Sequence, residues 1–351
     1  MPTHSFDYLL EATRQIFVAA GATPAEAEAV ASGLVRANLV GHDSHGIIRI
    51  PQYLASLQQG DIVAGGEVEV VAQTPATAVL DGHWGFGQPI AYRAARMGVD
   101  KARDHGVSAI TVRRSNHMGR MGEYVESVAQ QGAIGLLFCN MHGSGACVVP
   151  WGGSSPRLGT NPLAVGIPRT DGGALVLDMT TSVVAEGKVR VLRNRGEAVP
   201  EGWILDGDGR PSTDPMDFYS PDKRGSLLPF GGEAGHKGYG LNVVIDLLAG
   251  ALSGASTTGG REARQGNAVF LLVVDISQFV PPEDFHAAVD EFEDFVKSSA
   301  PAPGYDQILM PGDPEVRQSE RRGAEGIYVE DETWAQVVGC AAELGVELEA
   351  Q

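Results

Sequence analysis

The chain has 351 residues, of which 43% are hydrophobic and 20% are charged, so it is long enough for two or three domains with a sizeable buried core. Its formal net charge is -18, which repels nucleic acid and anionic lipid, so an anionic substrate needs local basic residues. No apolar stretch is long enough to span a bilayer, so neither nucleic acid nor a membrane is expected as a partner.

The first part of the chain has the apolar spacing of amphipathic helices. Helices are expected over residues 5–20, 24–40 and 51–58. The second of these has clear boundaries, because Thr23 and Glu26 form a capping-box pattern at its start and Gly41 is a plausible stop. This segment is therefore predicted to be all-helical.

From about residue 65 the pattern changes to strands that alternate with helices. Strands are expected over residues 66–71, 77–82, 107–115, 133–140, 163–168, 174–179 and 268–276. Helices are expected over residues 87–106, 123–132, 180–196, 238–252, 281–299 and 332–346. Residues 143–162 and 301–315 are rich in turn-forming residues and are predicted to be loops.

This order predicts an α/β fold whose sheet is partly parallel. We expect a helical N-terminal segment over residues 1–70 and a mixed-sheet body over residues 71–300. A C-terminal segment over residues 301–351 is expected to return to the helical part, so that the two ends of the chain form an all-helical domain.

The densest group of chemically active residues is GHDSHGIIR, at residues 41–49, just after a predicted helix end. The negative end of a helix favours a protonated imidazole, and Arg49 offers a planar fork that suits a carboxylate. One turn could therefore supply a proton donor, Ser44 and a carboxylate clamp. The alternative is a polar loop in which Asp43 and Ser44 cap the next turn.

Polar residues also follow predicted strands. His117, in SNHMG, follows a β-branched strand, and Asp178, in LDMTTS, ends another strand before possible helix caps at residues 180–182. Open α/β sheets bind ligands at such strand ends, but a loop histidine and plain capping are the alternatives. In GHKGYG, Lys237 lies at a helix start where phosphate is favoured, and a flexible turn is the alternative.

Several common motifs are missing from the sequence. It contains no GxGxxG, no Walker A loop and no HExxH, so a Rossmann domain and a zinc protease site are not expected. The cysteines at positions 139, 147 and 340 show no metal-ligand spacing, so no metal site is predicted. The first residues lack the regions of a signal peptide, so a cytoplasmic location is expected. A serine hydrolase using Ser44, a histidine and Asp178 stays conceivable, although GHDSHG does not match GxSxG.

Taken together, GHDSHGIIRIPQYL and SNHMG resemble the malate/L-lactate dehydrogenase family of the non-Rossmann type. That family is similar to ureidoglycolate, sulfolactate and hydroxycarboxylate dehydrogenases, and to diketogulonate and cyclic-imine reductases. Further matching segments are LGTNPLAV, LDMTTSVVAEGK, GWILDGDGRPSTDP, GHKGYGLNVVIDLL and MPGDPE, which cover nearly the whole chain in the right order. The resemblance implies a mixed-sheet domain that binds NAD or NADP, and a homodimer with its active site near the subunit contact.

The resemblance also implies roles for individual residues. His45 and His117 are joint candidates for the acid/base, Ser44 and Arg49 are expected to contact the substrate, and Asp178 is hypothesised to hold the imidazole in one tautomer. The residues expected to bind the cofactor are Asn140, Met179, Thr180, His236, Lys237, Gly312, Asp313, Pro314 and Glu315. Asn140 stands where some members have lysine or serine, which leaves its role and the substrate open.

The expected activity is hydride transfer between nicotinamide and a small 2-hydroxy or 2-oxo acid such as malate or lactate. Within the same scaffold, a ureidoglycolate-type dehydrogenase and a cyclic-imine (piperideine or pyrroline-2-carboxylate) reductase are the alternatives. A further alternative is a non-catalytic NAD(P)-binding protein. The presence of His45, Arg49 and His117 together argues against it.

Overall fold

The N-terminal helices form a layer of their own in the computed structural model, which describes residues 3–261 and 264–348. This layer contains α1 (Phe6–Ala19), α2 (Pro24–Leu39) and α3 (Ile50–Gln58). The predicted capping box is present, because the Thr23 side chain accepts from the Glu26 N–H and the Glu26 carboxylate accepts from the Thr23 N–H at 2.9 Å. After α2, Gly41 takes a φ of +90°, a conformation that ends the helix and favours glycine.

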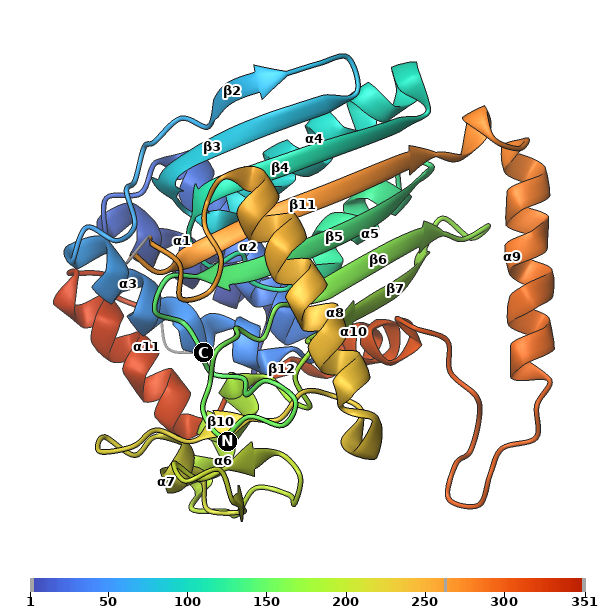
Figure 1. Ribbon diagram of the computed structural model, residues 1–351. Coiled ribbons are helices and arrows are strands. Elements are labelled where there is room, and N and C mark those ends of the chain that lie inside the picture. Colours follow the sequence, from blue (N-terminus) through green and yellow to red (C-terminus); the bar gives the residue numbers. More distant parts are fainter. Residues whose placement is uncertain (1–2, 262–263, 349–351) are drawn as a thin grey trace.

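The centre of the protein is a mixed sheet, which within the described residues has seven strands in the order β2-β3-β4-β11-β5-β6-β7 (Figure 1). The strands are β2 (Glu69–Gln73), β3 (Thr77–Gly85), β4 (Val107–Ser115), β11 (Gly266–Asp275), β5 (Ala133–His142), β6 (Leu163–Pro168) and β7 (Ala174–Met179). β3 and β4 run parallel, while the other neighbouring pairs are antiparallel. The predicted partly parallel sheet is confirmed, with β11 inserted between β4 and β5.

Helices cover both faces of this sheet. α4 (Gly87–His105) and α5 (Gly122–Ala129) pack on one face and enclose the largest apolar core, while α8 (His236–Ile245) crosses the other face (Figure 1). A uniform helix was expected over residues 238–252, but α8 changes to a π-helical turn at Asp246–Ala251. There the Asp246 carboxylate is drawn into the sheet by the Asn140 amide, which donates to it at 2.9 Å. No helix in the described part of the chain is long and apolar enough to cross a membrane.

A smaller layer lies between β7 and α8 in the sequence. It contains α6 (Glu186–Arg195), β8 (Ile204–Leu205), β9 (Pro211–Ser212), α7 (Pro215–Phe218) and β10 (Ser226–Leu227), packed around an apolar cluster of their own. The helix predicted to follow capping residues 180–182 begins later, at Glu186, and no side chain of the described residues caps it. The Thr180 hydroxyl donates to the Ser182 carbonyl and the Ser182 hydroxyl donates to the Val184 carbonyl, so these side chains hold the backbone outside the helix.

The two ends of the chain meet. β1 (Thr3–His4) pairs with β12 (Ile327–Tyr328), and α11 (Asp331–Glu343) packs against the N-terminal helices. Buried residues of both ends, such as Ile16 and Ile327, belong to one apolar cluster. The expected fold class, a mixed sheet beside a helical domain formed by both terminal segments, is therefore confirmed.

The segment before α11 differs from its predicted form at one point. Residues 301–315 were expected to be loop throughout, but α10 (Asp313–Glu325) begins inside them. Gly312 precedes the helix with a φ of +95°, and Pro314 occupies its first turn, which needs no backbone N–H donor. A glycine followed by an Asp-Pro pair was read as a loop, although proline at this position is also typical of a helix start.

We predict that the C-terminal strand is essential to the helical layer. Ile327 is fully buried in the shared cluster, so Ile327→Ala should lower the free energy of unfolding by about 2–5 kcal/mol through the cavity that it leaves. Val338, on α11, is 40% exposed, so Val338→Ala should change the free energy of unfolding by less than ~0.5 kcal/mol. Urea unfolding followed by circular dichroism measures both. Equal stability of the two variants would contradict this packing.

Candidate active site

A large cavity lies where the helical layer, the sheet edge and the smaller layer meet. Its volume is about 1220 Å³, at or above the ~300–1,000 Å³ that is typical of small-molecule sites. Basic side chains line it: Arg49, Arg120, Lys188, Arg190, Arg195 and Arg224. In a chain of net charge -18, this local excess of cations favours an anionic ligand.

The loop after α2 forms one wall of this cavity and is firmly held. The Asn38 side chain donates to the Asp43 carboxylate at 2.7 Å and accepts from the Ile47 N–H at 2.8 Å. Arg322, on α10, donates to both oxygens of the Asp43 carboxylate, at 2.6 Å and 3.0 Å. A side chain at Gly46 would overlap Asn38, since its Cβ would lie 2.1 Å from the Asn38 Oδ1. The loop that carries the predicted catalytic residues is thus rigidly built.

His45 and His117 come together in the cavity, as the sequence reading required. Their rings are stacked, with centroids 5.6 Å apart and planes 11° from parallel. His45 Nδ1 lies 3.2 Å from the Ser44 hydroxyl, and His117 Nδ1 lies 2.7 Å from the Tyr53 hydroxyl. The site therefore presents two imidazoles side by side, each with an oriented ring.

Both imidazoles are held in the neutral form. Burial, and next the charge of Arg49, lower the pKa of His45 to about 3. The same causes in the same order hold the pKa of His117 well below its usual range. We expected the helix end to favour imidazolium, but the partial charge there is outweighed by desolvation and by a full positive charge.

Arg49 lies behind the two rings and is about nine-tenths buried. Its Nε donates to the Ser44 carbonyl at 2.7 Å and its Nη1 donates to the Gln52 side chain at 2.8 Å. In the described residues no carboxylate forms an ion pair with it, and burial lowers its pKa. The charge of nearby Glu186 raises that pKa without an ion pair between the two, so the buried guanidinium still favours an anionic ligand.

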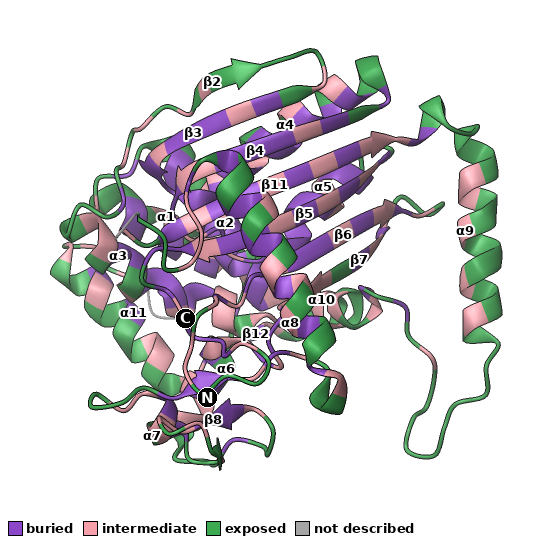
Figure 2. Cartoon of the chain, viewed as in Figure 1, coloured by how far each residue is buried: buried purple, intermediate pink, exposed green. Residues whose placement is uncertain are grey.

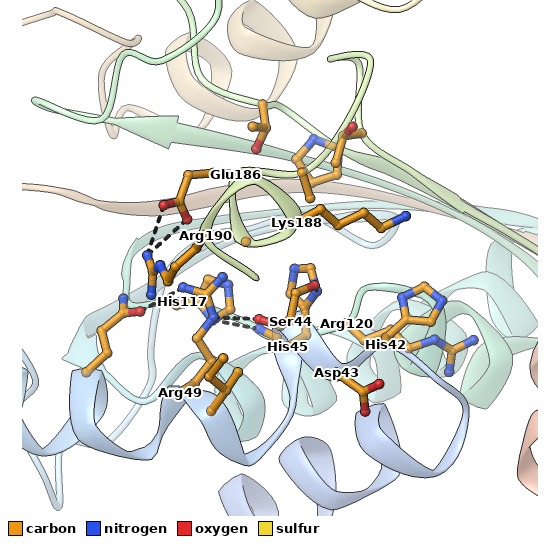
Figure 3. A pocket seen from close by; sticks show the side chains of 18 of the residues that line it. His42, Asp43, Ser44, His45, Arg49, His117, Arg120, Glu186, Lys188 and Arg190 are labelled. Atoms are coloured by element: carbon orange, nitrogen blue, oxygen red, sulfur yellow. Dashed lines mark hydrogen bonds and ion pairs between the residues drawn. The ribbon is translucent and has the colours of Figure 1, made fainter. Parts of the chain in front are cut away.

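α6 lies across the cavity from these residues, and Figure 3 shows its Glu186, Lys188 and Arg190 facing His45, Arg49 and His117. Arg190 pairs with Glu186 at 3.0 Å, and Tyr219 also donates to Glu186. The helix comes this close because residue 187 is glycine, whose added Cβ would lie 2.8 Å from Ser44 Cβ.

Asp178 lines the cavity, but it binds a backbone N–H and not the imidazole that the sequence predicts. Its carboxylate accepts from the Gly122 N–H at 2.7 Å and lies 4.0 Å from Arg120 Nε. It therefore joins the end of β7 to the start of α5, while Ser44 and Tyr53 contact the imidazoles. Met179 and Thr180 line the same part of the cavity.

The other predicted cofactor residues lie outside the cavity wall. Asn140 is fully buried in β5 and donates to Asp246, while His236 and Lys237 are exposed at the start of α8. Gly312 precedes α10 and Pro314 lies in its first turn. Within that turn, Asp313 pairs with Arg169 at 2.8 Å and Glu315 pairs with His42 at 3.0 Å.

Other residues of the site were missed from sequence. Tyr53 lies four residues after Arg49 on α3, a helical spacing that could have drawn attention to it. Arg190 likewise follows Glu186 by four residues. Arg120 gave no local signal, because a basic residue next to SNHMG can equally face solvent. Its side chain is buried, and among the described residues its Nε has no hydrogen-bond partner, with Asp178 4.0 Å away.

The comparisons with known proteins identify the family of the chain. The family model for malate/L-lactate dehydrogenase matches residues 4–338. The chain belongs to the malate/L-lactate dehydrogenase family. The resemblance seen in GHDSHG and SNHMG is thus confirmed, including its expected span of nearly the whole chain.

Relatives within this family are similar over almost their full length. The chain is 38% identical to the L-sulfolactate dehydrogenase of Methanothermobacter thermautotrophicus, over 96% of this chain and 95% of that one. It is 36% identical to hydroxycarboxylate dehydrogenase B of Escherichia coli, over 98% and 95%. Among solved structures, malate dehydrogenase from Entamoeba histolytica matches with a TM-score of 0.93 and 27% identity, covering 99% of each chain.

We predict that Arg49 sets part of the histidine pKa values. Arg49→Gln removes a positive charge beside both rings, so the pKa of His45 and of His117 should rise. Both should stay below the usual histidine value, because burial is the larger cause. Nuclear magnetic resonance of ¹⁵N-labelled histidine measures this, with Arg36→Gln, on the outer side of α2, as a matched loss of charge. An unchanged or lower pKa in Arg49→Gln would contradict the coupling.

Proposed function

We propose that this protein is an NAD(P)-dependent oxidoreductase that transfers a hydride between nicotinamide and a small 2-hydroxy or 2-oxo acid. The observation that carries this proposal is the stacked pair of His45 and His117 beside the buried, unpaired Arg49. Imidazole handles a proton and guanidinium binds a carboxylate, which are the needs of a 2-hydroxy acid. Nicotinamide, when bound, supplies or accepts the hydride.

The low histidine pKa values suit oxidation in the free enzyme. A neutral imidazole can accept the proton of the C2 hydroxyl as the hydride leaves. When a substrate carboxylate binds Arg49, it cancels the charge that lowers both pKa values, so imidazolium becomes easier to form. In the reverse direction the protonated ring then donates to the C2 oxygen. Arg49 thus couples substrate binding to the proton transfer.

The substrate carboxylate has a prepared binding position. Gln52 and the Ser44 carbonyl hold the Arg49 guanidinium in one plane, which favours binding in a single orientation. Ser44 also places its hydroxyl beside His45, so the loop can contact both ends of a short acid. The acid itself, whether malate, lactate or a similar one, is left to experiment.

The remainder of the cavity fits a large anionic cofactor, NAD or NADP. Its volume exceeds the needs of a small acid, and the buried Arg120 Nε lacks a hydrogen-bond partner. We propose that Met179, Thr180 and Asp178 line this part. Farther contacts are proposed for Asn140, for His236 and Lys237 at the start of α8, and for Gly312, Asp313, Pro314 and Glu315 at the start of α10. Nowhere in the described ranges do three His, Cys, Asp or Glu side chains gather as metal ligands.

Absorbance of the nicotinamide band tests the proposed function directly. Purified protein is mixed with NAD or NADP and with malate, lactate, sulfolactate or ureidoglycolate. The reduced cofactors are tested with the matching 2-oxo acids and with piperideine-2-carboxylate. Turnover of a 2-hydroxy acid supports the proposal. Turnover of only the cyclic imine, or cofactor binding by fluorescence without any turnover, would contradict it.

We predict that both histidines matter for turnover. His45→Ala and His117→Ala should each lower kcat by at least ~10²-fold, because general acid and base catalysis is typically worth that much. His105→Ala, at the end of α4 and away from the cavity, is the matched control and should keep normal turnover. If both cavity variants fold and turn over normally, the acid/base assignment is wrong.

We also propose a cytoplasmic homodimer. Cys139, Cys147 and Cys340 are free thiols, as is usual in a reducing compartment. α9 (Pro282–Lys297) stands apart from the body in Figure 1, none of its residues is buried, and Figure 2 shows it exposed along its length. Phe292 and Phe295 are 59% and 74% exposed, which is typical of a surface that a second copy covers.

We predict that α9 forms the subunit contact. The double variant Phe292→Glu and Phe295→Glu should convert a dimer to monomers, because charge in an apolar contact is unfavourable. Light scattering after gel filtration measures the mass. Met216→Glu, at a residue 56% exposed on α7, should leave the dimer intact. A monomeric wild-type protein at micromolar concentration would refute the homodimer.

A further inference from the structure

The hydroxyl of Tyr53 makes more contacts to His117 than packing alone requires. It lies 2.7 Å from the His117 Nδ1 and 3.2 Å from the carbonyl oxygen of the same residue. The Gln88 amide donates to the hydroxyl oxygen at 3.0 Å. Tyr53 is only 2% exposed, and burial raises its pKa to about 12, so the hydroxyl keeps its proton.

A second donor points at the same ring nitrogen. The Gly119 N–H donates to His117 Nδ1 at 3.3 Å, and a backbone N–H can only donate. This contact requires a lone pair on Nδ1, so the neutral ring carries its proton on Nε2. In this arrangement the Tyr53 O–H also donates to Nδ1. The resting form is therefore a poor base, because its cavity-facing nitrogen is already protonated.

Acid/base chemistry at Nε2 needs the proton on Nδ1 instead. The Nδ1–H must then donate to the Tyr53 oxygen, and the Tyr53 O–H needs another acceptor. The His117 carbonyl, 3.2 Å away, is that acceptor. The phenol oxygen can accept from Nδ1–H and from Gln88 together. One rotation of the O–H bond thus gives Tyr53, Gln88 and the Nδ1–H partners in the second form, while the Gly119 N–H gives up its 3.3 Å contact to Nδ1.

We propose that Tyr53 is a positioning residue whose oxygen accepts from the Nδ1–H of His117 and so stabilises the tautomer that acts as a base at Nε2, an inference that rests on the proposed function. In oxidation, the C2 hydroxyl proton passes to Nε2 of the ring protonated on Nδ1, and the hydride leaves with its electron pair to NAD(P)⁺. The product ring is imidazolium, whose Nδ1–H still donates to Tyr53. Reduction reverses each transfer.

The charged and titratable groups around His117 come from several elements. Arg49 and His45 face it from the loop after α2, Tyr53 faces it from α3, and Arg190 faces the cavity from α6. Arg49 and His45 disfavour imidazolium, while the Tyr53 oxygen stabilises any ring form with a proton on Nδ1. The bond from charged imidazolium to this oxygen is stronger than the neutral bond in the resting form, so loss of the hydroxyl should lower the pKa of His117 further.

Tyr53→Phe tests the proposal because it removes only the hydroxyl. We expect kcat to fall by ~10-fold or more in both directions, part of the effect of a full acid/base group. KM for the acid should change little, because Arg49 keeps its own partners. In the pH profile of kcat, the limb that reflects protonation of His117 should move to lower pH in oxidation, where the neutral ring acts. It should also move to lower pH in reduction, where imidazolium acts.

Tyr124→Phe is the matched control. Tyr124 is also buried, and its hydroxyl donates to the Met118 carbonyl in the loop that carries His117. This variant loses a buried hydroxyl and one anchor of the same loop, but it leaves Nδ1 untouched. Thermal unfolding verifies that both variants fold. Equal loss of kcat in the two, with an unmoved pH limb in Tyr53→Phe, would overturn the proposal.

A readout without turnover separates this proposal from the proposed function. In ¹⁵N-histidine-labelled protein, the His117 signals are identified by their loss in His117→Asn. The Nδ1 resonance should shift in Tyr53→Phe and stay in place in Tyr124→Phe, because only the first variant removes a hydrogen bond to it. An unshifted Nδ1 overturns the role of Tyr53. Absence of turnover with every acid would instead overturn the proposed function. The spectrum would then still show whether Tyr53 forms a hydrogen bond to His117 Nδ1.

Discussion

The site depends on one buried positive charge. Arg49 lies buried behind two imidazoles, bound to a carbonyl and an amide but to no carboxylate. Its charge disfavours protonation of both rings, and under the proposed function an acid group bound to Arg49 would remove that effect. Much of the surrounding structure serves to keep this charge in place. The loop is held through Asn38, α6 approaches through Gly187, and the acidic surface elsewhere leaves the cavity as a local basic region.

Local signals predicted most of the fold. The capping box at Thr23, the alternating strands and the long amphipathic helices appear close to their expected bounds, because each depends on neighbours in the sequence. The insertion of β11 between β4 and β5 could not be predicted, since the choice of strand partner depends on the whole sheet. The misread segments, residues 180–185 and the start of α10, are those where side chains or a single proline change the backbone locally.

The candidate site was predictable where its chemistry is concentrated in short motifs. His45, Arg49 and His117 stood out because imidazole and guanidinium occur there in dense or strand-end positions. Tyr53, Arg120 and Arg190 were missed because tyrosine and arginine on helices are ordinary, and only the folded chain shows which of them face inward. The partner of Asp178 was mistaken for a similar reason: its distance from the N–H groups of α5 is a property of the assembled sheet.

The contact between Arg322 and Asp43 joins residues that are 279 positions apart. Arg322 also donates to the Asn38 carbonyl, and the strand after it pairs with the first residues of the chain. During synthesis the N-terminal helices emerge first, yet the loop that carries His45 lacks this clamp until almost the whole chain has left the ribosome. A nascent or prematurely ended chain therefore holds the loop of His45 less firmly, and the cavity is complete only near the end of translation.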